Sequence, residues 1–391
     1  MRLHPIASRT LALTIASLAL SGCSGHGKYT AEHMSKAKEK MEVMKSATEW
    51  EMARQAFLSG DLDKALKTVD RSIALNSKVC KSYVLRGRIL MEMQRLDEAL
   101  GAFEEAAKLD PKQSDPPYYT ALAYERISRP DLAIEHYRKA TELDPENPQY
   151  AIATAEVMID LNQITEARAF LESRFATFKH NTGVRQSLGH IALLQKNPKE
   201  AVDQFNQARL LAPDDMSILE DLIRAQVETG EYAQAESSLS KILEGPSGKD
   251  RRDLQHLHAR CLLAVERPMD ARAAYLKLVD GAEGQADIEA WIGLGVVSYR
   301  INDDAKLRLS AARLVAIAPT RAEGFLLRAL YLNRTGDRAA AQRAMAKAST
   351  LTSESGDATA LVTAVRTEMD HPTTQADQAR TTITAAPSDT N

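Results

Sequence analysis

The feature that most constrains the fold is an alanine that returns every 34 residues along much of the chain. Such a fixed spacing indicates an internal repeat, in which one structural unit is copied and stacked. Two later units are each preceded by two extra residues, after which the spacing of 34 resumes. The nine successive positions hold Ala65, Ala99, Ala133, Ala167, Ala201, Ala235, Ala271, Leu307 and Ala341. Eight alanines in nine positions are more than an alanine-rich composition explains.

Two further positions hold a small and a bulky side chain in most units. Small residues let two helices approach closely, and a larger side chain there leaves voids or strain. The small position holds Ala53, Gly87, Ala121, Ala155, Gly189, Ile223, Ala259, Gly295 and Ala329. The bulky position holds Val69, Phe103, Tyr137, Leu171, Phe205, Leu239, Tyr275, Ala311 and Met345. These intervals predict two short helices per unit, packed against each other.

Helix-ending and helix-starting residues support the same division. Residues that tolerate a left-handed backbone follow the first helix of five units, namely Gly60, Asn162, Gly230, Asn302 and Gly336. Prolines suited to the first turn of the second helix are Pro130, Pro198 and Pro268, and capping aspartates are Asp61, Asp303 and Asp337.

The period and the order of small and large residues resemble the tetratricopeptide repeat, a unit of about 34 residues. The resemblance covers Ser46 to Ser353 in nine units, and Tyr83 to Pro111 is among the best matches. The seventh unit is the weakest, and we expect a local change of geometry between Gly245 and Gln285. The resemblance implies an all-α fold, an α/α superhelical solenoid of about nine helix-turn-helix units.

The N-terminal residues have the pattern of a targeting segment. Residues 1–22 combine a positive start with an apolar run too short to span a bilayer comfortably, and Leu-Ser-Gly-Cys at residues 20–23 resembles a bacterial lipobox. By that resemblance Cys23 is the lipidated residue, and Ser24 directs the protein to the outer membrane, facing the periplasm. An ordinary cleaved signal with an incidental cysteine is the alternative.

The remaining segments flank the repeats. Residues 23–45 are expected to be the lipidated cysteine, a tether and an N-terminal helix lined by Met34, Met41 and Met44, and residues 46–353 are the solenoid. Residues 354–371 are expected to form a helix that caps the last repeat, and residues 372–391 a disordered tail.

The sequence offers little for catalysis or for nucleic-acid binding. The net charge of -3 lacks a basic footprint. His256 and His258 are two residues apart and point in different directions on a helix, so they do not predict a metal site. Cys80 and Cys261 lie five repeats apart, which disfavours a disulfide, and both are expected to be buried in helix packing. We therefore predict no enzyme activity, cofactor, metal or small-molecule substrate.

In tetratricopeptide proteins the first helix of every unit lines an inner surface that receives extended or helical peptides. Carried onto this chain, the resemblance gives as candidate partner-binding residues Trp50, Arg54, Arg88, Tyr118, Tyr119, Glu156, His190, Arg224 and Arg260. The arginines beside aromatic rings suit an acidic partner segment. The alternative is that these are simply solvated side chains.

The function predicted on this basis is that of a membrane-anchored scaffold or assembly factor for an envelope complex of the pilus, secretion or outer-membrane biogenesis type. That assignment is by architecture rather than by site residues. The alternative is an accessory protein or enzyme that associates directly with the cell wall or with polysaccharide.

Overall fold

The computed structural model describes residues 28–245, 248, 250–355 and 365–369. The predicted signal segment, Cys23 and the predicted C-terminal tail lie outside the described residues. All regular elements in these ranges are helices, which confirms the predicted all-α class. The helices form two compact units, whose boundary lies between Lys179 and His180.

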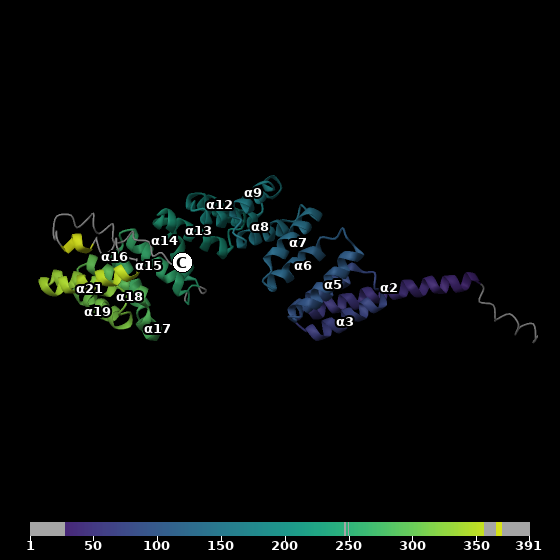
Figure 1. Cartoon of the computed structure of the whole chain (residues 1–391), viewed down its shortest axis with the longest axis horizontal. Helices are drawn as coiled ribbons and strands as arrows, with labels where there is room; N and C mark the ends of the chain where they lie inside the picture. Colours follow the sequence, from purple (N-terminus) through teal and green to yellow (C-terminus); the bar gives the residue numbers. More distant parts are fainter. Residues whose placement is uncertain (1–27, 246–247, 249, 356–364, 370–391) are drawn as a thin grey trace, which may run out of the picture. The chain divides into compact units, whose positions relative to one another are not determined.

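The first unit contains four pairs of antiparallel helices and one extra turn (Figure 1). In each pair the two helices are consecutive in sequence and pack against each other. The elements are α2 (Lys28–Leu58), α3 (Leu62–Leu75), α4 (Cys80–Glu92), α5 (Leu96–Leu109), α6 (Asp115–Arg126), α7 (Pro130–Leu143), α8 (Pro148–Asp160), α9 (Ile164–Glu172) and the short α10 (Phe175–Phe178).

The second unit contains five such pairs within the described ranges, so the total of nine agrees with the sequence prediction. A five-residue helix at 365–369 follows them. The elements are α11 (Thr182–Leu194), α12 (Pro198–Leu211), α13 (Met216–Thr229), α14 (Tyr232–Glu244), α15 (Arg252–Ala264), α16 (Pro268–Leu278), α17 (Gly281–Ala286), α18 (Ile288–Arg300), α19 (Asp304–Ile317), α20 (Glu323–Arg334) and α21 (Arg338–Ser355).

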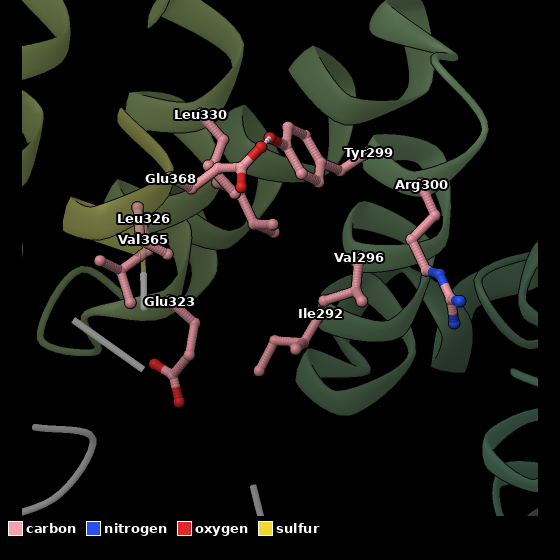
Figure 2. A pocket seen from close by; sticks show the side chains of 10 residues that line it. Ile292, Val296, Tyr299, Arg300, Glu323, Leu326, Leu330, Val365 and Glu368 are labelled. Carbon is pink, nitrogen blue, oxygen red and sulfur yellow. Dashed lines mark hydrogen bonds between the residues drawn. The ribbon is translucent and has the colours of Figure 1, made fainter. Parts of the chain in front are cut away.

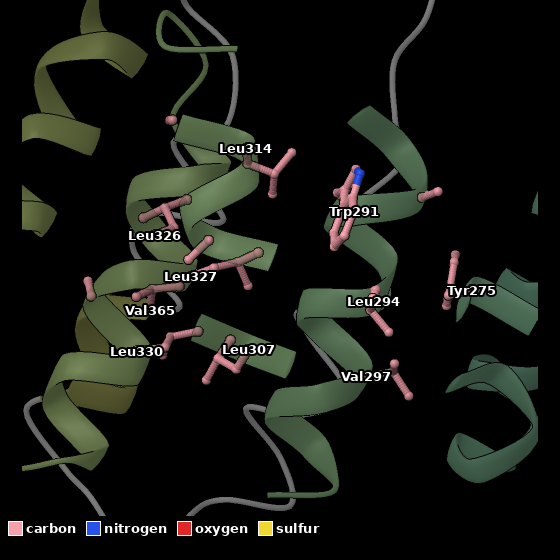
Figure 3. Packing of buried hydrophobic residues seen from close by; sticks show 14 of the residues in the cluster. Tyr275, Trp291, Leu294, Val297, Leu307, Leu314, Leu326, Leu327, Leu330 and Val365 are labelled. Atoms are coloured by element: carbon pink, nitrogen blue, oxygen red, sulfur yellow. The ribbon is translucent and has the colours of Figure 1, made fainter. Parts of the chain in front are cut away.

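The repeating alanine position is the centre of the packing in every pair. All eight alanines, and Leu307 in the eighth unit, have an exposed fraction of 0%. Around them the bulky side chains of adjacent helices meet, as Figure 3 shows for Trp291 and Leu294 of α18, Leu307 of α19 and Leu327 of α20. The small residues thus let the helices approach, and the bulky ones fill the remaining space.

The predicted helix ends are confirmed. Gly60, Gly230 and Gly336 have φ near +81° to +89°, and Asn162 and Asn302 have φ of 59° and 60°. Four residues that sequence reasoning did not select adopt the same left-handed backbone, namely Gln94, Ser128, Lys196 and Glu266. The side chains of Asp61, Asp303 and Asp337 each accept a hydrogen bond from a backbone N–H in the first turn of the following helix.

The N-terminal helix and the first helix of the first repeat are one element. α2 runs for 31 residues without interruption. Its first half exposes the predicted methionines, with exposed fractions of 58% for Met34, 48% for Met41 and 65% for Met44. No helix in the described ranges has the length and apolar content that crossing a bilayer requires.

The predicted irregularity lies between the seventh and eighth pairs. The short α17 is inserted there, and the indole Nε1–H of Trp291 donates to the backbone oxygen of Gly284 over 3.0 Å. A Cβ at Gly284 would lie 2.4 Å from the backbone oxygen of Leu278, so only glycine fits. The insertion is therefore packed into the fold.

The two described cysteines differ in burial. Cys261 is fully buried and burial raises the pKa of its thiol to about 12. Cys80, at the start of α4, is only half-buried, so the prediction that both are buried was wrong for Cys80. Its position at a helix end leaves part of the side chain outside the interface between helices. Neither cysteine forms a disulfide.

Candidate protein-binding surface

The candidate residues lie on the first helices of successive pairs, which are neighbours within each unit. Hydrogen bonds between residues 31 to 35 positions apart join these helices directly, for example from the Trp50 indole of α2 to the Lys81 carbonyl of α4 over 3.2 Å. We call the side chains at equivalent positions of these helices the first-helix surface of each unit.

In the first unit, Arg54 is paired but accessible. Its guanidinium donates two hydrogen bonds to the carboxylate of Glu51, the shorter at 2.7 Å, and 41% of its side chain is exposed. Hydrogen bonds from Arg54 and Gln55 lower the pKa of Glu51 to about 2. Exposed pairs of this kind contribute little to stability. A partner carboxylate can therefore compete with Glu51 for Arg54 at small cost.

Arg88 is held by aromatic rings. The centre of its guanidinium lies 5.2 Å from the ring centroid of Phe57 and 4.9 Å from that of Tyr119. Tyr119 is itself stacked on Phe103, with 5.8 Å between the ring centroids. Cation–π contacts of this kind fix an arginine in place while its N–H groups keep donor capacity. The structure thus brings Arg88 and Tyr119 together.

Trp50 and Tyr118 contribute to packing as well as to the surface. Trp50 packs against the buried cluster around Ala53, and the Nζ of Lys81 lies 4.2 Å from its ring centroid. The ring of Tyr118 lies 4.8 Å from that of Tyr150 and 5.7 Å from that of Tyr137. The sequence placed both residues on the surface and did not indicate these contacts. Glu156, on α8, is exposed.

In the second unit, His190 belongs to a polar cluster. The carboxylate of Asp221 on α13 accepts from Gln186 over 2.7 Å and lies 2.8 Å from the Nε2 of His190, both on α11. Burial alone raises the pKa of Asp221, but the hydrogen bonds from His190 and Gln186 outweigh burial and hold that pKa below its ordinary value. The carboxylate is therefore ionised and links two first helices.

A second carboxylate repeats this arrangement two pairs further on. Asp287, which begins α18, contacts Arg252 and lies 2.8 Å from the Nε2 of His256 on α15. Sequence reasoning missed Asp221 and Asp287 as partners of these helices. Asp287 caps the start of α18, as Asn181 and Asp215 cap α11 and α13. An aspartate before a helix is a capping signal in the sequence, but it does not indicate the contact with the preceding first helix.

The two remaining candidates, Arg224 and Arg260, are exposed. Arg224 has 55% of its side chain exposed and lies 3.8 Å from the carboxylates of Glu220 and Asp221. Arg260 is on the neighbouring α15. In this unit the first-helix surface therefore presents both signs of charge.

The last two pairs present an apolar surface instead. Ile292 and Val296 of α18 and Leu326 and Leu330 of α20 line a narrow pocket with a cavity volume of about 40 Å³. The helix at 365–369 closes one side of this pocket with Val365 and Glu368 (Figure 2). Sequence reasoning did not select these residues as a site. The signal was available, because the repeat positions that hold Trp50 and Arg54 in the first pair are apolar in the last two pairs.

The histidines predicted to point apart do so. His256 contacts Asp287, whereas the Nε2 of His258 lies 3.0 Å from the Oγ of Ser240 on α14. Within the described ranges, no three histidine, cysteine or carboxylate side chains are grouped as a metal ion would require.

Comparison with known proteins agrees with the repeat architecture. Models of the tetratricopeptide repeat match residues 51–114, 84–148 and 128–189. Residues 51–189 are tetratricopeptide repeats. Beyond residue 189 the same succession of helix pairs continues to α21, with the alanine of the tetratricopeptide pattern replaced only by Leu307.

Two similar proteins differ in how much of their own length this chain matches. Superkiller protein 3 of Schizosaccharomyces pombe is 26% identical over 46% of this chain, and the match spans only 14% of the relative. The type IV pilus assembly protein PilF of Pseudomonas aeruginosa is 23% identical over 50% of this chain and 77% of the relative. A solved structure of Pseudomonas aeruginosa pilF has a TM-score of 0.44 at 20% identity, covering 51% of this chain and 90% of that chain.

Proposed function

We propose that this chain is a non-enzymatic protein-interaction scaffold that helps to assemble an envelope complex, anchored to the outer membrane through lipidated Cys23 and facing the periplasm. The observation that carries the proposal is the match to PilF, a pilus assembly protein, over 77% of that relative's length. The lipobox-like residues 20–23 support the anchor, because a lipid chain on Cys23 would hold the N-terminus at a membrane.

The first-helix surface supports binding of protein segments. In the first unit, Arg88 is fixed between Phe57 and Tyr119, so its guanidinium is ordered before a partner arrives. Ordering in advance reduces the entropy lost on binding. Together with the exposed Arg54, this arrangement suits a segment that carries carboxylates next to an aromatic or aliphatic side chain.

The experiment is crosslinking in intact cell envelopes. A photoreactive amino acid replaces Arg54 on the first-helix surface, and a control chain carries it at Leu210, which is 76% exposed on the second helix α12. We expect a defined protein adduct from position 54 and none from position 210. A Cys23→Ser chain should leave the membrane fraction and lose the adduct.

A contrary result is well defined. If position 54 yields only cell-wall or polysaccharide material, or the same adducts as position 210, the scaffold proposal fails and the cell-wall alternative is favoured. If the Cys23→Ser chain stays in the membrane fraction, the lipid anchor is wrong.

A further inference from the structure

We infer that the apolar surface of α18 and α20 is a binding site for a short amphipathic helix. That helix carries two apolar side chains four residues apart and a carboxylate directly before the second apolar residue. The chain's own residues 365–369 occupy this site, so a partner helix binds by displacing them. The inference deepens the proposed scaffold function, on which it rests, by naming one binding site and the chemistry of its ligand.

The apolar character of the site distinguishes it from the neighbouring first helices. On α11, α13 and α15 the corresponding inward positions carry histidine, arginine, glutamate and glutamine. On α18 and α20 they carry Ile292, Val296, Leu326 and Leu330, which line the pocket together. Burial of such side chains by a ligand removes apolar surface from water, which favours the complex.

The resident segment shows what the site accepts. Val365 is 1% exposed and Met369 packs against the same buried cluster, so residues four apart face the site from one side of a helical turn. Between them Glu368 accepts a hydrogen bond of 2.6 Å from the hydroxyl of Tyr299. Figure 2 shows Tyr299 meeting Glu368 while Ile292 and Val296 extend from α18 into the pocket.

The polar contact selects a carboxylate. The guanidinium of Arg334 on α20 lies 4.2 Å from the ring centroid of Tyr299 and donates to the Tyr299 backbone oxygen over 2.8 Å. The ring is therefore held in one orientation, with its hydroxyl toward the ligand and a positive charge beside it. An acidic ligand side chain gains the hydrogen bond from this hydroxyl, and hydrogen bonds to charged groups are the stronger ones.

The resident segment is suited to displacement. Its described part, residues 365–369, is a little over one helical turn, and a helix of that length is not stable by itself in water. Its attachment to the same chain supplies a high effective concentration, which a separate ligand has to overcome. The association constant measured for an added helix is then the intrinsic value multiplied by the fraction of chains whose site is free.

The test uses the full-length chain and a labelled synthetic peptide with the sequence of residues 360–371, followed by fluorescence anisotropy. The variant Val365→Asp with Met369→Asp vacates the site, and we expect it to bind the peptide about tenfold more tightly than the unaltered chain. Adding Val296→Glu on α18 should abolish binding. The control Leu309→Glu, on a side chain 46% exposed on the second helix α19, should not change it.

A matched pair of changes keeps the test valid if Val296→Glu disturbs folding. Tyr299→Phe in the vacated chain removes only the hydroxyl donor, and a peptide with Glu368→Gln removes only the charge. We expect each change to weaken binding, and the two together to weaken it hardly more than either does. Circular dichroism should show unchanged helix content for the Phe variant.

Three results would overturn the inference. The first is equal peptide affinity of the unaltered and vacated chains, and the second is peptide binding that Tyr299→Phe leaves unchanged. The third is a fall from dimer to monomer mass when the site is vacated, which would mean that residues 365–369 bind a second copy of the chain. None of them bears on the adducts formed at position 54. Loss of those adducts with intact peptide binding would instead overturn the proposed function alone.

Discussion

At the scale of single residues, the packing depends on matched pairs of a small and a large side chain. Gly87 faces Phe103, and a Cβ on Gly87 would lie 2.3 Å from the ring carbon Cε1 of Phe103. Gly189 faces Phe205 in the same way, at 2.5 Å. Where the bulky position holds Val69 or Leu171 the small position is alanine. At Gly87 and Gly189, glycine is therefore required by the phenylalanine opposite.

We expect Gly87→Ala to lower the free energy of unfolding by about 1–3 kcal/mol, because the ring of Phe103 has to leave its site. Adding Phe103→Leu should recover part of the loss. Urea denaturation of the three chains measures this. The control is Gly101→Ala on α5, where nothing lies within 4 Å of the added carbon, and there we expect a gain of about 0.5–1 kcal/mol. Equal effects at both glycines would contradict the pairing.

At the scale of helices, three first helices each end in an arginine that donates a hydrogen bond to a backbone oxygen near the end of the preceding first helix. Arg126 donates to the backbone oxygen of Met91 over 2.9 Å, Arg300 to that of Leu263 over 3.1 Å and Arg334 to that of Tyr299 over 2.8 Å. The last carbonyl groups of a helix have no partner within the helix. Each arginine thus couples two neighbouring repeats through the backbone.

We expect Arg300→Lys to lower the free energy of unfolding by about 1–2 kcal/mol, since the ammonium cannot donate to both Leu263 and Glu266 in the same geometry. Glu266→Gln is the control. Its side chain is 69% exposed, and an exposed pair contributes little, so we expect a change below about 0.5 kcal/mol. If the two variants unfold at the same denaturant concentration, the backbone contact is not what matters.

The helices themselves followed from the sequence, and their side-chain partners did not. The alanine spacing fixed the nine pairs because a small residue is required wherever helices cross closely. The left-handed backbone at Lys196 and Glu266 was not predicted, because the repeat geometry imposes it on residues that do not favour it. The partners Asp221 and Asp287 depend on the offset between neighbouring helices, which local patterns do not encode.

At the scale of the molecule, ion pairs join successive repeats within the second unit. Burial alone raises the pKa of Asp287, but hydrogen bonds from the Ala290 N–H, Arg252 and His256 outweigh it and hold that pKa below the ordinary value of 3.8. A carboxylate whose pKa is lowered by folding stabilises the folded state fully above its unfolded pKa. That stabilisation is lost as pH falls through the lower, folded pKa.

We expect Asp287→Asn to lower the free energy of unfolding at pH 7 by about 1–3 kcal/mol, because asparagine keeps the helix cap but not the charge opposite Arg252 and His256. The loss should shrink as pH is lowered below 3.8. Hydrogen exchange should show weaker protection in α15 and α18 and unchanged protection in α4, since repeats stabilise mainly their neighbours. A loss independent of pH would contradict the ionic role.

The candidate site was predictable only in part at this scale. The first-helix positions of Arg54, Arg88 and Tyr119 came from the repeat pattern, and the structure places them on neighbouring helices. The pocket under residues 365–369 was not predicted, because it depends on a contact between Tyr299 and Glu368, 69 positions apart. Contacts over such separations do not appear in local periodicity.

The uninterrupted course of α2 has a mechanical consequence. A helix of 31 residues is a stiff rod roughly 45 Å long, and it has no turn at the point where the first repeat begins. A force applied at Lys28 is therefore transmitted to the packed residues around Ala53 without a hinge to absorb it. A contact at the start of α2 therefore sets the distance and the direction in which the first repeat is presented.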